Sequence, residues 1–193
     1  MKTIGLTGGI GSGKTTVARM FEVFKIPIYI ADTEAKVLME QSKVIRQELE
    51  SLLGTSIYKN GRLNRGYMAD MIFNNSQLLN QVNQIVHPRV EVHFQEWKKQ
   101  FNSVYCIKEV AILFENNGHL KCDKTILVVA DKEERINRVM LRDNVNREKV
   151  LERISHQWPD SKKIPLSDYI IKNNNIEDTR KQVKRLHSIL IDS

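Results

Sequence analysis

The feature that most constrains this chain is a glycine-rich octet close to its N-terminus. Residues 8–15 read GGIGSGKT and match the pattern G-x-x-x-x-G-K-[ST]. A short apolar segment, residues 3–7, precedes the octet, and apolar residues at helical spacing follow it as far as Phe24. The order strand, loop, helix is the context in which this pattern binds nucleotide phosphates.

The chemistry of phosphate binding explains the residue types of the octet. Glycines let successive backbone amides turn toward phosphate oxygens, and the N-terminus of the following helix adds its own amides and the positive end of its dipole. Lys14 is expected to reach the β- and γ-phosphates, and the Thr15 hydroxyl to ligate Mg²⁺. We therefore predict an ATP or GTP site, although hydrolases, motors and small-molecule kinases all share this loop. The residues expected to contact the nucleotide here are Gly8, Gly9, Gly11, Ser12, Gly13, Lys14, Thr15 and Thr16.

Five short apolar runs predict the buried strands of one parallel sheet. Stretches with helical spacing separate the runs, which is the alternation of an α/β protein with helices on both faces of its sheet. The predicted fold is therefore a three-layer α/β/α domain. The runs are residues 3–7, 27–31, 104–107, 125–130 and 169–171.

A long helical insertion separates the second run from the third. Apolar residues recur at helical spacing throughout residues 33–103, a segment too long for a single crossover helix. We predict a helical subdomain at 33–103, inserted into a core made of residues 1–32 and 104–193. Pro88 is expected to begin the last helix of the insertion, because the first helical position tolerates the missing amide.

Composition excludes several classes of protein. A hydrophobic content of 41% is too high for a disordered chain, and no apolar run approaches the roughly 20 residues of a membrane span. We expect a cytoplasmic protein with no membrane partner, and Cys106 and Cys122 suit a reducing compartment.

The 30 basic and 23 acidic residues give a net charge of +7, which predicts an anionic partner. Nucleic acid, acidic lipid and phosphorylated small molecules all fit that charge.

Acidic residues at strand ends favour a small-molecule kinase over a hydrolase. The apolar segments 105–109 and 126–131 each end in one acidic residue, and neither ends in the paired carboxylates of a hydrolytic site. Asp32 follows the second run, at the end of a parallel strand where ligands bind. There it can orient an acceptor hydroxyl and accept its proton. An equally open interpretation makes Asp32 the N-cap of a helix that begins near Thr33.

A row of arginines suggests a lid over the phosphates. Arg135, Arg138 and Arg142 fall on one side of a predicted helix, and guanidinium groups match phosphate oxygens in pairs. The alternative is a solvated face on which these arginines pair with Glu133, Glu134 and Asp143. For the row as a set we favour a lid that closes on phosphates.

These segments, in this order, resemble one family, the dephospho-coenzyme A kinases, nearly from end to end. The octet with residues 4–7 is similar to the N-terminal signature of that family, and Ala31-Asp32 to its second strand. The further segments that resemble it are 60–65, 72–73 and 85–88 in the insertion, then 112–115, 138–143 and 167–174.

The resemblance implies an activity and a set of site residues. It implies transfer of the γ-phosphate of ATP to the ribose 3′-hydroxyl of dephospho-coenzyme A, with Mg²⁺. The fold that it implies is an adenylate-kinase-like core of five parallel strands, with a helical substrate domain and a lid at residues 132–165. Asp32 and Lys14 become catalytic residues, and Asn173 an adenine-side contact. Arg138 and Arg142 become catalytic phosphate clamps, with Arg138 also binding ATP. The acceptor residues implied are Asp32, Lys36, His87 and Glu115.

Some alternatives stay open at this point. His87 can simply precede the proline of a helix start, and Glu115 can be a solvated residue after a strand. The chain departs from the family at Ala111, Lys36 and Asn175, none of which carries the phosphate-binding or acceptor-orienting role. Another nucleoside or nucleotide kinase is the second hypothesis, and a nucleic-acid-associated protein, supported only by the charge, is the third. We expect no nucleic-acid partner and a monomer or weak homo-oligomer.

Overall fold

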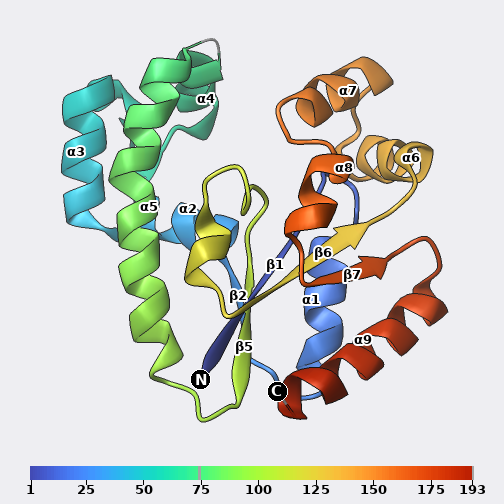
Figure 1. Ribbon diagram of the computed structural model, residues 1–193. Helices are drawn as coiled ribbons and strands as arrows, with labels where there is room; N and C mark the ends of the chain where they lie inside the picture. Colours follow the sequence, from blue (N-terminus) through green and yellow to red (C-terminus); the bar gives the residue numbers. More distant parts are fainter. Residues whose placement is uncertain (74, 193) are drawn as a thin grey trace. The chain divides into compact units, whose positions relative to one another are not determined.

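The structure is a computed structural model that describes residues 1–73 and 75–192 (Figure 1). The chain divides into two compact units, one made of Met1–Ile30 with Phe101–Ser193 and one made of Ala31–Gln100. The predicted insertion, 33–103, begins two residues later and ends three residues later than the second unit. Among the described helices, none is both long enough and apolar enough to cross a membrane.

The first unit is built on a five-stranded parallel sheet in the order β2-β5-β1-β6-β7. The predicted parallel α/β core is confirmed, and each strand lies within two residues of its apolar run. All strands are parallel, so the chain leaves β1 and β2 at the same edge of the sheet. The strands are β1 (Lys2–Gly8), β2 (Ile28–Ile30), β5 (Tyr105–Glu109), β6 (Lys124–Val129) and β7 (Tyr169–Lys172).

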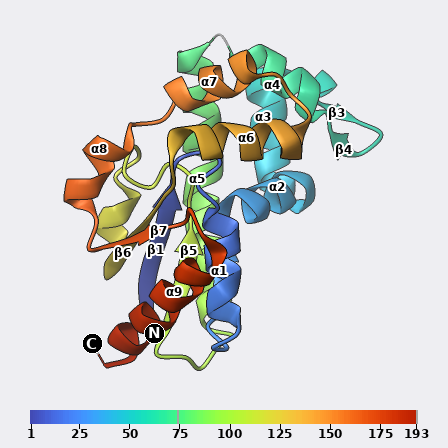
Figure 2. The ribbon, with the colours of Figure 1, turned by 90° about the vertical axis from the view of Figure 1, so that its right-hand side faces the viewer.

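Helices α1 (Lys14–Glu22) and α9 (Ile176–Asp192) cover one face of this sheet, as Figures 1 and 2 show. Alternate strand residues such as Ile4 and Leu6 point into the apolar core beneath them. Gly5 points to the other face, where an added Cβ would lie 2.8 Å from the side chains of Leu113 and Cys122. That face is covered by 3₁₀ helices η2 (Gly118–Lys121) and η3 (Ile164–Leu166) and helix α8 (Asp160–Lys163).

Two further helices follow β6, within residues 132–165, for which the sequence predicts a lid. They are α6 (Lys132–Asp143) and α7 (Arg147–Ser155), packed together through Ile136, Val139 and Val150. Asn144, in the left-handed region at φ 50°, turns the chain between them.

The second unit is helical, with a small hairpin. A stripe of buried residues at helical spacing, Val82, Val86, Val90 and Phe94, runs along one helix and packs it against its neighbours. Pro88 lies inside this helix, so the expectation that it begins a helix is wrong. The elements are α2 (Ala31–Gln41), α3 (Lys43–Leu53), η1 (Thr55–Ile57), β3 (Tyr58–Lys59), β4 (Arg62–Leu63), α4 (Arg65–Phe73) and α5 (Ser76–Lys98).

Candidate active site

The glycine octet forms the loop between β1 and α1, in the predicted strand-loop-helix order. Gly11 and Gly13 adopt φ values of 78° and 88°, which residues with a Cβ rarely adopt. The Ser12 amide donates to the Gly9 carbonyl at 3.0 Å and closes the turn. The Lys14 ammonium donates to the Gly8 carbonyl at 3.0 Å, so it is already folded back over the loop.

Asn173 and Arg138 lie against this loop. The Asn173 side-chain amide donates to the Ser12 carbonyl at 2.8 Å and accepts from the Thr179 hydroxyl at 3.0 Å. Arg138 donates to the Asn173 carbonyl at 3.0 Å, and one of its terminal nitrogens would lie 3.9 Å from a Cβ added to Gly13. The structure therefore brings both predicted residues to the loop, with the Asn173 amide committed to the loop backbone.

Glu109 completes a site that the sequence reasoning passed over. It ends β5, and its buried carboxylate accepts a hydrogen bond of 2.9 Å from the Thr15 hydroxyl. A hydroxyl and a carboxylate are the oxygen donors that Mg²⁺ prefers, so these residues fit the ion that a nucleotide brings. Its signal in the sequence is an apolar run that ends in an acidic residue, but a search for paired carboxylates does not find it because the carboxylate is single.

The lid arginines do not form one row on the phosphate side. Arg142 is exposed and donates twice to Asp143, at 2.7 and 3.1 Å, and Arg153 donates to the same carboxylate. Hydrogen bonds from Arg142 and then Arg153 keep the pKa of Asp143 below its usual value. Arg135 is buried against the loop, where it donates to the Ile10 carbonyl instead of lying free for phosphate, so its expected place in the row is wrong.

Glu115 is engaged inside the first unit. It pairs with the Lys163 ammonium at 2.8 Å and accepts from the Trp158 amide at 3.1 Å. The Lys163 side chain has an exposed fraction of 0%. Glu115 is therefore not a solvated residue, and its assignment to the acceptor stays a prediction that this ion pair does not support.

The second unit carries the other predicted acceptor residues. Helix α2 begins at Ala31, so Asp32 lies inside its first turn, and the interpretation of Asp32 as the N-cap of a helix that begins near Thr33 is wrong. Lys36 follows one turn later, on the same face of the helix as Asp32. His87 keeps an exposed surface on α5, yet loss of hydration lowers its pKa, and the charge of Asp32 partly opposes this. The charge of Asp32 therefore acts on His87 within this unit.

Comparison with known proteins gives one consistent result. The family model described as dephospho-CoA kinase matches residues 2–178. The dephospho-CoA kinase of Bacteroides fragilis (strain YCH46) is 37% identical over 188 residues, which cover 97% of this chain and 92% of the relative. That of Porphyromonas gingivalis is 43% identical over 157 residues, covering 81% and 78%. A crystal structure of a Thermus thermophilus protein superimposes with a TM-score of 0.88 at 30% identity, covering 99% of this chain and 97% of that one.

Proposed function

The chain belongs to the dephospho-CoA kinase family, and from this premise we propose how its own residues carry out the reaction. The enzyme transfers the γ-phosphate of ATP to the ribose 3′-hydroxyl of dephospho-coenzyme A and releases ADP and coenzyme A, the last step of coenzyme A biosynthesis. The observation that carries this function is the family match over residues 2–178, which includes both the phosphate loop and Asp32.

The phosphates of ATP bind to the octet. Amides of the loop and of the first turn of α1, including Thr16, donate to the phosphate oxygens. Lys14 exchanges the Gly8 carbonyl for the β- and γ-phosphates, where its charge offsets charge that develops during transfer. Arg138 already lies beside Gly13 and adds a second cation, and Asn173 supports the loop on the adenine side.

Thr15 and Glu109 would hold the Mg²⁺ that accompanies ATP. Their hydroxyl and carboxylate stand 2.9 Å apart and fit a hard cation that keeps several of its waters. When bound, the ion neutralises charge on the β- and γ-phosphates. The protein's part is to keep these two oxygens oriented toward the phosphates.

Asp32 orients the acceptor. The support for this role is the place of Asp32 in the chain, two residues after β2, since ligands bind beyond the carboxyl ends of parallel strands. The Asp32 carboxylate accepts a hydrogen bond from the ribose 3′-hydroxyl and takes its proton as the new P–O bond forms. Lys36 and His87, on the same unit, support acceptor binding.

The insertion and the lid have separate roles. Residues 33–103 form the acceptor domain, because Asp32 stands at its start and both Lys36 and His87 lie in it. Residues 132–165 form the lid, and Arg142 reaches the phosphates by leaving Asp143. Glu115 holds Lys163 at the base of this segment. A cytoplasmic, monomeric or weakly associating enzyme without a nucleic-acid partner remains our prediction.

Incubation of the protein with MgATP and dephospho-coenzyme A tests the function through the appearance of ADP and coenzyme A. The variant Asp32→Asn should bind ATP with the affinity of the original protein and lose about 10²- to 10⁴-fold in kcat, the usual contribution of a positioned base. Asp70→Asn, at an exposed residue of α4, is the matched control and should keep normal turnover.

Three results would contradict these assignments. No coenzyme A at micromolar enzyme would reject the reaction. Better turnover of another nucleoside or nucleotide in an acceptor panel would favour the second kinase hypothesis. Near-normal turnover of Asp32→Asn would remove Asp32 from its role.

A further inference from the structure

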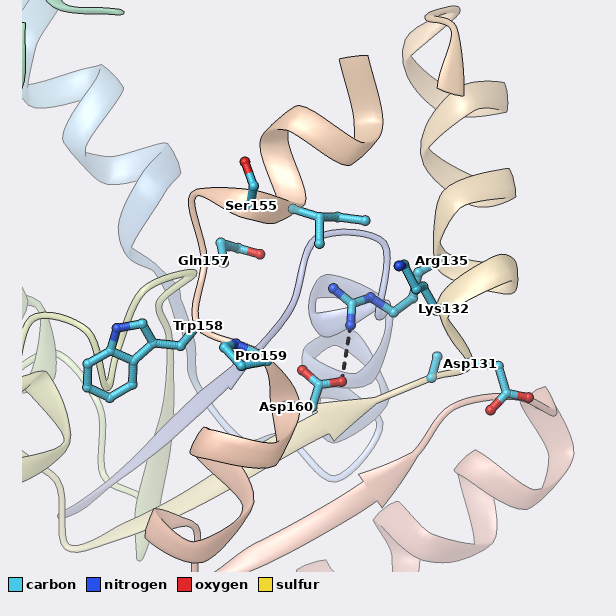
Figure 3. Close-up of a pocket in the computed structure, with 10 residues that line it drawn as sticks. Asp131, Lys132, Arg135, Ser155, Gln157, Trp158, Pro159 and Asp160 are labelled. Carbon is cyan, nitrogen blue, oxygen red and sulfur yellow. Dashed lines mark hydrogen bonds and ion pairs between the residues drawn. The ribbon is translucent and has the colours of Figure 1, made fainter. Parts of the chain in front are cut away.

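We propose that Arg135, Gln157 and Asp160 are positioning residues of the ATP site, an inference that rests on the proposed function. Arg135 belongs to the first turn of α6, whereas Gln157 and Asp160 follow α7. They therefore come from the two ends of residues 132–165, and they meet beside the phosphate loop (Figure 3).

These side chains hold both backbone groups of one loop residue, Ile10. The Ile10 amide donates to the Gln157 side-chain oxygen at 2.7 Å, and the Ile10 carbonyl accepts from the Arg135 Nε at 2.9 Å. Asp160 fixes the other edge of the Arg135 guanidinium through an ion pair of 3.1 Å. The guanidinium lies so close to Gly9 that a side chain at that position would collide with it.

Because of the geometry of the peptide bond, these contacts fix the direction of backbone amides in the loop. In a trans peptide the carbonyl and the following amide point in opposite directions. Because Arg135 holds the Ile10 carbonyl, the Gly11 amide must point away from Arg135. Asn173 acts in the same way two residues further along, since its side-chain amide holds the Ser12 carbonyl and so fixes the direction of the Gly13 amide. The loop is thus set to donate to phosphate before any nucleotide binds.

Packing alone does not account for the pairing of the buried Arg135 with the half-buried Asp160 at this place. Apolar residues of similar size are often at least as stabilising as a buried ion pair, because they avoid its desolvation cost. A cavity of about 560 Å³ borders Arg135, Gln157 and Asp160 (Figure 3), so hydrogen bonds rather than close packing fix them on that side. What the charged pair supplies is a donor with a fixed direction toward Ile10.

Calorimetric titration with ADP tests the inference, since it requires neither Mg²⁺ nor an acceptor. Arg135→Met and Gln157→Leu should each raise the Kd for ADP about tenfold or more, the effect of losing one charge-assisted or buried hydrogen bond. The KM for dephospho-coenzyme A should change by less than about twofold. Arg135→Lys should recover part of the affinity for ADP, because an ammonium can reach the Ile10 carbonyl. It cannot reproduce the planar guanidinium, which binds Ile10 and Asp160 through two different nitrogens.

Leu190→Ala separates positioning from general stability. It removes a buried side chain from the sheet core and should lower Tm while leaving the Kd for ADP within about twofold at 25 °C. Wild-type affinity in both Arg135→Met and Gln157→Leu, or an equal loss in Leu190→Ala, would overturn the inference. A protein that binds ADP but makes no coenzyme A would instead overturn the proposed reaction.

Discussion

Glu109 is a residue whose role follows from one hydrogen bond. Replacing its carboxylate by the amide of Gln keeps an acceptor for the Thr15 hydroxyl but removes the charge that a divalent cation needs. We predict that Glu109→Gln raises the Mg²⁺ concentration needed for half-maximal activity about tenfold or more, and that a chelator abolishes turnover of the unmodified enzyme. Magnesium titrations of activity at fixed ATP measure both effects. Glu96→Gln, at an exposed carboxylate paired with Lys99, should leave the titration unchanged, and an unchanged curve for Glu109→Gln would reject this metal site.

His187 makes the stability of the first unit depend on pH. Its Nδ1 lies 2.7 Å from the Tyr105 hydroxyl and its ring stacks on Phe24 at 4.2 Å. Burial lowers the pKa of His187 from the ordinary value of 6.5, so the unfolded chain takes up a proton more readily than the folded one. The stabilisation that neutral His187 provides is complete above pH 6.5. It is lost as the pH falls through the lower pKa that His187 has in the folded state.

Thermal unfolding between pH 8 and pH 5 measures this dependence. His187→Gln should be less stable than the original protein at pH 8 and should approach it at pH 5, because only the original protein has the half-buried imidazole of His187 to charge. His87, whose pKa is also lowered, provides the comparison: His87→Gln should keep most of the pH dependence that comes from His187. Parallel curves for His187→Gln and the original protein would contradict the assignment.

Residues of the site were predictable where their signal is local. The octet, with Lys14 and Thr15, is a contiguous motif, so its spacing alone identifies the phosphate loop. Glu109 and Gln157 were not predictable in the same way, because they meet the loop across 94 and 147 residues of sequence. Such pairings depend on which strands become neighbours in the sheet, and the order of the strands could not be predicted from a single sequence.

At the scale of elements, the lid depends on how its second helix begins. The Asn146 side chain accepts from the Lys149 amide and caps α7. Asn146→Ala should lower the free energy of unfolding by about 1 kcal/mol, the usual cost of a lost N-cap, and hydrogen exchange should speed up first in α7. Asn137→Ala, on the exposed side of α6, is the matched control and should be neutral or slightly stabilising, since alanine is the better helix former. Equal effects at the two positions would show that the cap contributes nothing.

Strands and helices were predictable to the extent that burial follows sequence periodicity. The five apolar runs became the five strands of one parallel sheet, and the three inner strands, β5, β1 and β6, are buried along most of their length. The edge strand β7 is less buried, since Ile170 is exposed and Ile171 is buried. Helix α5 shows where a local rule fails. Pro88 costs about 3 kcal/mol inside a helix, but burying Val82, Val86, Val90 and Phe94 contributes about 1.5–3 kcal/mol for each side chain, so the continuous apolar stripe outweighs the proline.

At the scale of the whole molecule, the excess positive charge is concentrated in one unit. The unit that holds the phosphate loop, 1–30 with 101–193, contains 21 basic and 15 acidic residues and carries +6 of the net +7. The unit 31–100 contains 9 basic and 8 acidic residues and carries +1. From composition alone, the net charge of +7 fits any polyanion. Most of that charge lies in the unit that holds the phosphate loop, so it fits ATP in particular.

This distribution of charge predicts how the salt concentration affects the KM for ATP. The KM for ATP should rise severalfold between ionic strengths of about 0.01 and 0.15 M, across which the Debye length falls from about 30 to about 8 Å. Lys184→Gln with Arg185→Gln removes two charges from an exposed part of α9 and should change this slope little, because the loop's own cations dominate at contact distance. Steady-state kinetics over a salt series, with and without added duplex DNA, measure the effect. A KM that does not change with salt would reject the electrostatic argument, and competition by DNA for the ATP site at 0.15 M salt would show that the charge serves nucleic acid instead.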